Sequence, residues 1–340
     1  MKREGNFYNQ IYSFDNLYKS YLKVRKGKRY KKEILEFSFF LEENLFEIQE
    51  DLKNETYKHG GYKKFIVKDS KKREIKAPKV RDRLVHHALC NLIYPVFDNT
   101  FYHYSYACRK GKGNHMAIDD LRRKLKNKGD FFCLKIDISK YFDSVNRCLL
   151  FKIIKSKIKD KKALKLIEKV IKSNEKGIPI GNLTSQLFAN IYLNEMDQFI
   201  KRELKVKCYF RYMDDFLILK ENKKELKIIK KLLEKFLKDD LDLIFNKKVT
   251  RIFPNFTGIN FLGYIIFEKY FLPRKKTVLK MIKKIKKRTR NEILISWKAY
   301  TKKTKSYRLF KSLFKKERGV DREYNDINLY LNYLHDSNNE

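Results

Sequence analysis

Two adjacent aspartates, Asp214 and Asp215, lie between two apolar segments and constrain this chain more than any other feature. The aromatic and β-branched residues of 209–212 and 216–219 predict a strand, a tight acidic turn and a returning strand. Burial of both strands would fix where the carboxylates point. Neighbouring carboxylates repel each other unless a cation or a proton lies between them, which suggests a divalent metal ion. An Asp-Asp turn is more often simply solvated, so the rest of the chain must decide between the two interpretations.

A third carboxylate occurs upstream in a similar setting. Asp137 ends the apolar segment 131–136, which also has the composition of a strand. Hard cations such as Mg²⁺ take oxygen ligands, and a pair of them can clamp the attacking and leaving oxygens of a phosphoryl transfer. We therefore predict that Asp137, Asp214 and Asp215 come together as a metal clamp.

The order of the motifs along the chain resembles the palm of a reverse transcriptase. The residues YMDD at 212–215 resemble the polymerase signature of that family, and KIDISKYF at 135–142 resembles its first metal-binding motif. The residues GIPIGNLTSQ at 177–186 resemble the family's motif that contacts template and nucleotide, and FLGY at 261–264 resembles its primer grip. The resemblance extends from about Tyr57 to the C-terminal region. It is nearest to the reverse transcriptases of diversity-generating retroelements, which are related to group II intron and defence-associated bacterial enzymes.

The resemblance implies an α+β right-hand polymerase fold, with fingers, a palm of antiparallel sheet plus helices, and a helical thumb. We expect an N-terminal helical segment at 1–55 and fingers at 56–130. The palm is expected at 131–273, with a helical excursion toward the fingers at about 149–177, and the thumb and tail at 274–340. Apolar residues at helical spacing over 14–55 and a hairpin pattern at 64–76 agree with this order.

The resemblance also assigns roles to individual residues. Asp137, the backbone carbonyl of Ile138, Asp214 and Asp215 would bind two Mg²⁺ ions, with Mn²⁺ as an alternative. An aromatic ring at Phe142 would lie beneath the sugar of the incoming nucleotide and clash with a 2′-hydroxyl, although without the resemblance it reads as an ordinary core aromatic. The other implied nucleotide contacts are Arg73, Lys68, Ile180, Gly181 and Lys248, and the implied template or primer contacts are Arg109, Gln186, Phe261, Leu262, Gly263 and Tyr264.

Two positions depart from the common reverse-transcriptase pattern. Ile180 stands where glutamine is usual, and Gln186 stands where proline is usual; both departures match the diversity-generating branch. An amide that could hydrogen-bond near the nascent base pair is replaced at 180 by a side chain that can only pack. Weaker geometric checking and lower fidelity follow, unless Ile180 merely repacks the loop and fidelity is set elsewhere.

Charge and composition limit the partners. Lysine and arginine total 80 against 41 aspartates and glutamates, a formal charge of +39, which favours a polyanionic partner. An AT-rich coding sequence could account for part of the lysine excess. No apolar run approaches the ~18 residues of a membrane span, and the polar start lacks the apolar segment of a signal peptide. Five widely spaced cysteines indicate neither disulfides nor zinc, so we predict a cytoplasmic protein without membrane contact.

The sequence therefore predicts an RNA-directed DNA polymerase that adds dNTPs to a primer 3′-hydroxyl. Template RNA, cDNA product and dNTPs are the expected partners. One expected role is error-prone copying in a diversity-generating retroelement, with a small basic accessory protein. The alternative is an antiphage defence enzyme that makes cDNA from a dedicated noncoding RNA. An inactive RNA-binding scaffold is the third hypothesis, and the intact set of three aspartates argues against it.

Overall fold

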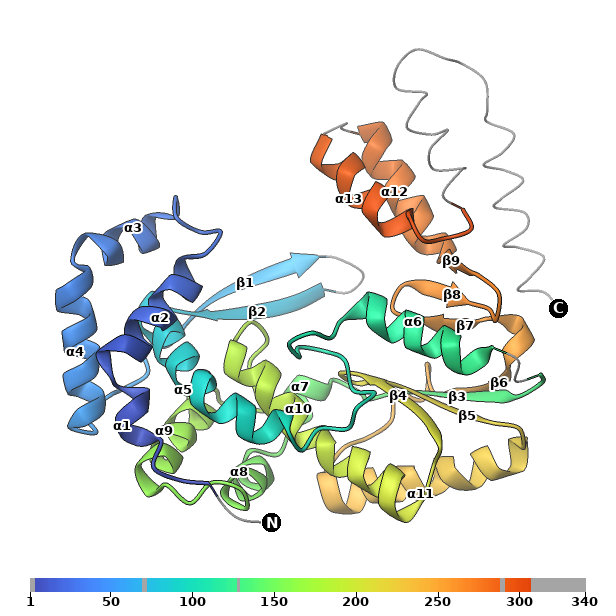
Figure 1. The fold of residues 1–340 in the computed structure, drawn as a ribbon, viewed down its shortest axis with the longest axis horizontal. Helices are drawn as coiled ribbons and strands as arrows, with labels where there is room; N and C mark the ends of the chain where they lie inside the picture. Colours follow the sequence, from blue (N-terminus) through green and yellow to red (C-terminus); the bar gives the residue numbers. More distant parts are fainter. Residues whose placement is uncertain (1–3, 69–71, 127–128, 288–290, 307–340) are drawn as a thin grey trace.

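The computed structural model describes residues 4–68, 72–126, 129–287 and 291–306. Within these ranges the strands form a two-stranded, a four-stranded and a three-stranded sheet, all antiparallel. Figure 1 shows a helical N-terminal end, the four-stranded sheet at the other end, and α12 and α13 standing above it. The predicted α+β class, with antiparallel sheet plus helices, is confirmed, while the boundaries of fingers, palm and thumb stay a prediction.

Helices open the chain, as the spacing over 14–55 predicts. They are α1 (Tyr8–Ile11), α2 (Phe14–Arg25), α3 (Lys32–Phe39) and α4 (Leu41–Lys53). Ser13 caps α2, because its hydroxyl accepts a hydrogen bond from the backbone N–H of Asn16. Leu17 and Leu45 are fully buried in the core that these helices share with α5 (Val80–Asp98).

The hairpin β1 (Tyr62–Lys68) and β2 (Lys72–Pro78) follows, with Tyr62 opposite Pro78. Its apolar residues Phe65, Ile66 and Val67 are exposed. The base of β2 is tied to the rest of the molecule, since the backbone N–H of Lys76 donates to the carbonyl of Ile180 (2.9 Å). This hairpin, called the fingers hairpin below, therefore extends from a fixed base beside the loop that contains Ile180.

The four-stranded sheet, called the palm sheet below, has the order β4-β5-β3-β6. Its strands are β3 (Phe132–Asp137), β4 (Cys208–Tyr212), β5 (Asp215–Lys220) and β6 (Arg251–Pro254). Alternate residues enter two different cores, as expected for a sheet covered on both faces. Phe216 and Ile218 pack into one core with α10 (Leu183–Gln198) and α11 (Lys223–Leu241), whereas Leu217 and Leu219 pack into another with α6 (Asn114–Leu125).

A helical segment interrupts the palm sheet between β3 and α10, as predicted. It comprises α7 (Tyr141–Ser144), α8 (Arg147–Lys155) and α9 (Lys161–Lys172). Asn146 and Asp160 cap α8 and α9, and Asp160 also accepts hydrogen bonds from the backbone N–H groups of Phe7 and Tyr8. The excursion thus packs back against the N-terminal helices, on the side where the fingers are expected.

The third sheet consists of β7 (Ile259–Phe261), β8 (Tyr264–Ile266) and β9 (Phe271–Pro273). Two helices follow, α12 (Lys275–Lys287) and α13 (Asn291–Thr301). They lie within the predicted thumb and tail at 274–340, and the part of that region from 307 onward lies outside the described residues. None of the described helices has the length and apolar character needed to cross a membrane.

Candidate active site

The hairpin of β4 and β5 carries the paired aspartates, as predicted. Tyr212 pairs with Asp215, so Met213 and Asp214 form a two-residue turn, and Met213 has a left-handed backbone (φ 56°). Asp214 lies in the turn itself, whereas Asp215 is the first residue of β5. Because the strands below are buried, the two carboxylates are fixed at one edge of the palm sheet.

Asp137 reaches the same edge from β3. It pairs directly with Asp215 across the sheet, which places the carboxylates of β3, the turn and β5 at one end of the sheet. Ile138 forms a bridge with Phe245, and the hydrogen bonds flanking that bridge are made by Asp137 and Ser139. The backbone carbonyl of Ile138 therefore faces away from Phe245, toward the β5 side where the aspartates lie.

Asn246 holds Asp137 in place, a role that the sequence did not reveal. Its side-chain amide donates to Asp137 Oδ2 (2.7 Å), and its backbone N–H donates to the Asp137 carbonyl (2.7 Å). Only an asparagine shortly before two lysines was visible in the sequence. Asn246 meets Asp137 because the segment 244–246 runs beside the end of β3, which only the folded structure shows.

Asp215 has a different neighbour. Lys135 Nζ lies 3.1 Å from Asp215 Oδ2 and also donates to the backbone carbonyl of Asn260 (2.6 Å). The other carboxylate oxygen, Oδ1, is buried and has no hydrogen-bond partner among the described residues. A buried carboxylate oxygen without a donor is costly unless a cation or proton approaches it.

Electrostatics make the same point for the turn. Burial, together with the charges of Asp137 and Asp215, raises the pKa of Asp214 to about 6, while Arg73 opposes the shift. Burial also raises the pKa of Asp215, and Lys135 opposes that rise. The ionised forms are therefore strained at neutral pH, and a bound cation would relieve the strain.

The donor set fits a hard divalent cation, because it consists of carboxylate oxygens, one of them unpartnered. Within the described residues, however, no three His, Cys, Asp or Glu side chains are grouped as ligands of one ion. The Lys135 ammonium on Asp215 and the Asn246 amide on Asp137 each take one carboxylate oxygen that a metal could use.

Most of the predicted nucleotide contacts lie on the fingers hairpin, on α7 and in the 177–181 loop. Arg73 lies exposed on β2, and its charge acts on Asp214 across the gap between fingers hairpin and palm sheet. Phe142 is half-buried at the start of α7, and its carbonyl accepts from the N–H of Ile178 (2.9 Å), which connects it to the 177–181 loop. Gly181 has φ 120°, and a Cβ there would lie 2.9 Å from Ile75 of β2. The side chain of Lys68 lies outside the described residues.

Lys248 and Gln186 are exposed. Lys248 lies two residues after Asn246, so it is anchored near Asp137, and Gln186 lies on the first turn of α10 after the Gly181 loop. Both positions are accessible to a ligand, and their roles stay predictions.

Arg109 is a correction. Its guanidinium donates to Asp98 Oδ1 (2.7 Å) and to the carbonyls of Tyr102 (2.8 Å), Ser105 (3.0 Å) and Asp98 (3.3 Å), and its side chain is only 8% exposed. The predicted loop and following helix are present, but this arginine stabilises the loop internally, which leaves it unavailable to a template phosphate in this structure. In the sequence, an arginine beside glycines is typical of a phosphate-binding loop. The pairing with Asp98, which the sequence does not show, gives this arginine a structural role instead.

The predicted primer grip forms the turn between β7 and β8. Leu262 and Gly263 both have positive φ (50° and 93°), while Phe261 and Tyr264 are buried. Tyr300 of α13 donates to the Gly263 carbonyl (2.7 Å). The tip of this hairpin is therefore partly exposed, and Phe261 and Tyr264 support it from within.

A second buried network lies next to the turn that carries Asp214, and sequence reasoning missed it. Arg211 of β4 and Asp197 of α10 are both fully buried and form an ion pair, with Arg211 Nε 2.8 Å from Asp197 Oδ1. Tyr209 donates to Asp197 (2.6 Å), and Arg211 donates to Asn190 (2.9 Å). An arginine beside the signature gave no hint of its partner 14 residues upstream in the chain.

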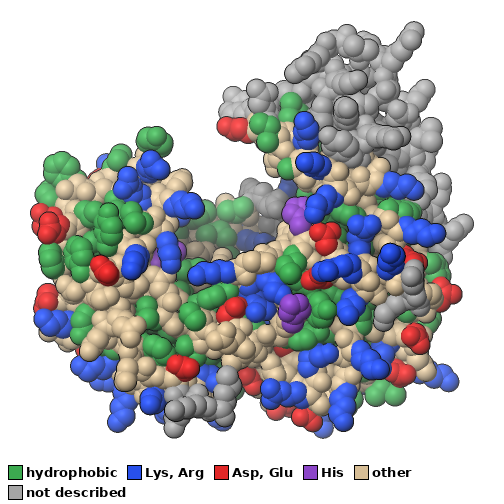
Figure 2. Space-filling view, viewed as in Figure 1, with side chains coloured by type: hydrophobic (Ala, Val, Ile, Leu, Met, Phe, Trp, Pro, Cys, Tyr) green, Lys and Arg blue, Asp and Glu red, His purple; other side chains and the backbone are tan. Residues whose placement is uncertain are grey.

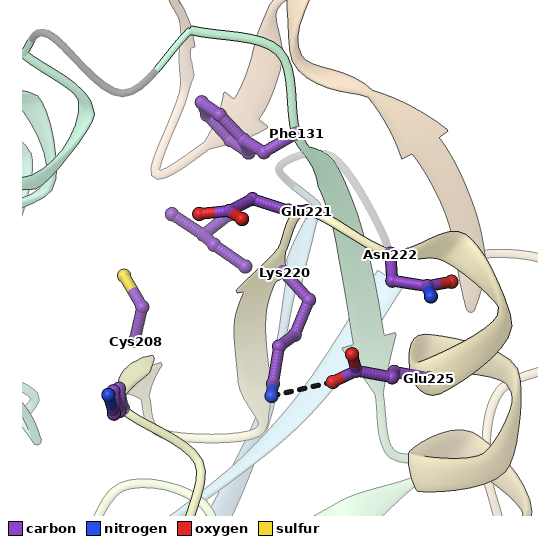
Figure 3. Close-up of a pocket in the computed structure, with 8 residues that line it drawn as sticks. Phe131, Cys208, Lys220, Glu221, Asn222 and Glu225 are labelled. Carbon is purple, nitrogen blue, oxygen red and sulfur yellow. Dashed lines mark hydrogen bonds and ion pairs between the residues drawn. The ribbon is translucent and has the colours of Figure 1, made fainter.

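Two cavities differ in their relation to the acids. A small one of about 240 Å³ lies at the opposite end of the palm sheet, lined by Phe131, Cys208, Lys220, Glu221, Asn222 and Glu225 (Figure 3). A larger one of about 1040 Å³ lies between α3 and the fingers hairpin and reaches Gly181. The acidic residues that line it are Glu33 and Glu36, and the more numerous basic ones are Lys28, Lys31, Lys32, Lys63, Lys79 and Arg83.

The face in Figure 2 is hollowed between the fingers hairpin and α12–α13, with lysine and arginine side chains on both sides.

Comparison with known protein families shows which family the chain belongs to. The family model described as reverse transcriptase (RNA-dependent DNA polymerase) matches residues 58–266, more than half of the chain. The chain therefore belongs to the reverse transcriptase family, whose domains use divalent metal ions.

Individual relatives agree. Protein YkfC of Escherichia coli is 28% identical over 246 residues, covering 59% of this chain and 65% of YkfC. The group II intron-encoded protein LtrA of Lactococcus lactis is 27% identical over 334 residues, covering 75% of this chain and 55% of LtrA. The chain thus spans less than two thirds of either relative. A solved structure of telomerase from Candida albicans with a telomeric RNA fragment gives a TM-score of 0.49 at 14% identity, covering 64% of this chain and 46% of that one, a likeness too weak to support a conclusion.

Proposed function

We propose that this protein is an RNA-directed DNA polymerase that joins dNTPs to a primer 3′-hydroxyl. The observation that carries the proposal is the register of the palm sheet, which brings Asp137, Asp214 and Asp215 to one edge in a chain of the reverse transcriptase family. Two Mg²⁺ ions held by these carboxylates and the Ile138 carbonyl, with Mn²⁺ as an alternative, would activate the 3′-hydroxyl and stabilise the charge of the leaving pyrophosphate.

The other site residues position substrates. Arg73 carries a positive charge that opposes the rise in the pKa of Asp214, and it would supply the cation that the triphosphate of an incoming nucleotide needs. Phe142, fixed by the 177–181 loop, supplies the ring that would exclude a 2′-hydroxyl and so select deoxynucleotides. Gly181 allows close approach of β2, because a Cβ there would lie 2.9 Å from Ile75, and this would place the hairpin beside the nascent base pair. Lys248 would act on the pyrophosphate, and the tip at Leu262 and Gly263 would hold the primer.

The basic cavity beside Gly181 supports binding of a nucleic-acid template there. Its lysines and Arg83 offer several cations to a phosphate backbone, next to the loop expected to contact the nascent pair. The cysteines, all of which lie within the described residues, are thiols rather than disulfides, which fits a reducing cytoplasm.

For the biological role we favour error-prone copying in a diversity-generating retroelement, with a small basic accessory protein. Ile180 carries this preference. Its backbone carbonyl accepts from the N–H of Lys76 in the fingers hairpin, and its aliphatic side chain can pack against the nascent pair but cannot hydrogen-bond to it. A defence enzyme that copies a dedicated noncoding RNA is the alternative. Sequencing cDNA from cells that carry the native flanking DNA separates the two, because substitutions at template adenines indicate the first and faithful or repetitive cDNA the second.

Primer extension on an RNA template tests the activity. The wild type should extend a DNA primer with dNTPs and Mg²⁺ and reject ribonucleotides, and Asp137→Asn should lower the rate by about a thousandfold or more, because charge stabilisation at the reacting phosphate is the largest catalytic contribution. Asp240→Asn, an exposed carboxylate on α11, is the matched control and should retain full activity. Equal extension by wild type and Asp137→Asn would remove the catalytic assignment.

A further inference from the structure

Lys135 is an unusual residue for the middle of a sheet. It lies on the central strand β3 and is only 8% exposed, on the face of the strand that also buries Cys133. Lysine is rarely buried unless it is paired. Its two partners are Asp215 Oδ2 at 3.1 Å and the backbone carbonyl of Asn260 at 2.6 Å. The ammonium therefore has specific contacts on two sides.

Those two contacts belong to different sheets. Asp215 starts β5 of the palm sheet, whereas Asn260 is the middle residue of β7 in the three-stranded sheet. Asn260 lies two residues before the turn at Leu262, and Tyr300 holds the far side of that turn. A single ammonium thus connects a carboxylate of the metal site to the strand that carries the primer-grip tip.

We propose that Lys135 is a positioning residue that sets the distance between the primer 3′ end, held at the Leu262–Gly263 tip, and the carboxylates that bind metal. The inference rests on the proposed polymerase function and adds a coupling between its two halves. The three-stranded sheet contacts the palm sheet through apolar side chains, which allow small slips. Two charge-assisted hydrogen bonds from one ammonium, to Asp215 and to the carbonyl of Asn260, fix the spacing more tightly than packing alone.

The same ammonium has an opposite effect on metal binding. A positive charge 3.1 Å from an Asp215 oxygen repels a second cation brought to that carboxylate. Replacing Lys135 by a neutral residue should therefore strengthen metal binding while slowing nucleotide transfer. A lysine with only a structural role would weaken both or change neither, so the pair of measurements separates the two roles.

The experiment compares Lys135→Met and Lys135→Arg with the wild type. Mn²⁺ binding is measured from the EPR signal of the free ion, and single-turnover primer extension is measured at saturating Mn²⁺ with varied dNTP. Lys135→Met should bind Mn²⁺ at least threefold more tightly, extend at least tenfold more slowly, and keep its half-saturating dNTP concentration within twofold. Lys135→Arg should restore extension to within about threefold of wild type, because it keeps a positive charge and N–H donors for Asp215 and the Asn260 carbonyl.

Lys220→Met is the matched control, since Lys220 is also a sheet lysine in an ion pair (Glu225, 2.7 Å) but lies at the opposite end of β5 (Figure 3). It should change neither quantity. The proposal is overturned if Lys135→Met binds Mn²⁺ no more tightly than wild type, or extends within twofold of it. Should Lys135→Met not fold, Lys135→Gln takes its place, because its amide can still donate to Asn260. A wild type that extends no primer would instead refute the polymerase function, whatever Lys135 does.

Discussion

Two charged clusters lie on one β-hairpin and differ in how completely their charges are satisfied. Around Arg211, both members of the ion pair are fully buried, and Tyr209 and Asn190 add further hydrogen bonds. Three residues later, at the turn, burial raises the pKa of Asp214 to about 6, and one oxygen of Asp215 is buried with no partner among the described residues.

The difference separates support from chemistry. The Arg211 cluster is closed: each charge already has its partner, so the cluster joins β4 to α10 and leaves nothing for a ligand. The aspartate edge is open, and its repulsion can be relieved only by a proton or a cation. A saturated buried pair directly behind an unsaturated one keeps the open carboxylates in place while they remain free to bind.

The closed cluster gives the largest expected effect on stability. Arg211→Met should lower the free energy of unfolding by about 3–5 kcal/mol, because it leaves the Asp197 carboxylate buried without a counter-charge. Urea unfolding followed by circular dichroism measures it. The double variant Arg211→Met, Asp197→Leu should recover more than half of the loss, since no unpaired charge remains.

Lys220→Met serves as the control for that series. Its ion pair with Glu225 is partly exposed, with side chains 33% and 50% accessible, so its loss should cost at most about 1 kcal/mol. If Arg211→Met cost no more than Lys220→Met, the Arg211 cluster would not be the closed support described above.

The sequence predicted the open edge far better than the closed cluster. Asp214, Asp215 and Asp137 stand out because each follows or precedes an apolar strand, which the local composition predicts. The partners of Arg211 and Asp137, which are Asp197 and Asn246, come from elements whose relative placement depends on long-range packing. Arg109 differs, because its partner Asp98 lies only 11 residues upstream, at the end of α5, and yet no local pattern shows that the two side chains meet.

Without metal, the aspartate edge should destabilise the folded protein at neutral pH, and this cost should disappear at acid pH. The folded pKa of Asp214 is about 6, above the ordinary 3.8, so the folded state holds the proton more tightly than the unfolded state. Ionised Asp214 therefore costs stability above pH 6, and the cost disappears as pH falls through 6 toward 4. Asp214→Asn should be about 1–3 kcal/mol more stable than wild type at pH 7.5 in EDTA, with the gap closed near pH 4.

Urea unfolding at stepped pH in EDTA measures this gap. Asp240→Asn, which removes an exposed carboxylate, should follow wild type at every pH. A gap for Asp214→Asn that is absent at pH 7.5, or that persists unchanged at pH 4, would show that the turn is not electrostatically strained.

The smallest expected effect concerns metal itself and distinguishes the two clusters most directly. A divalent ion that binds only the folded protein, at ten times its Kd, stabilises it by about 1.4 kcal/mol. Because the chain carries a formal charge of +39, added salt also stabilises it by screening, so each Mg²⁺ sample needs an NaCl sample of equal ionic strength. The excess stabilisation by Mg²⁺ should be present in wild type and in Asp240→Asn, and lost in Asp137→Asn. If Asp137→Asn kept the full excess, the ion would be binding elsewhere, and the aspartate edge would no longer be the open cluster of the pair.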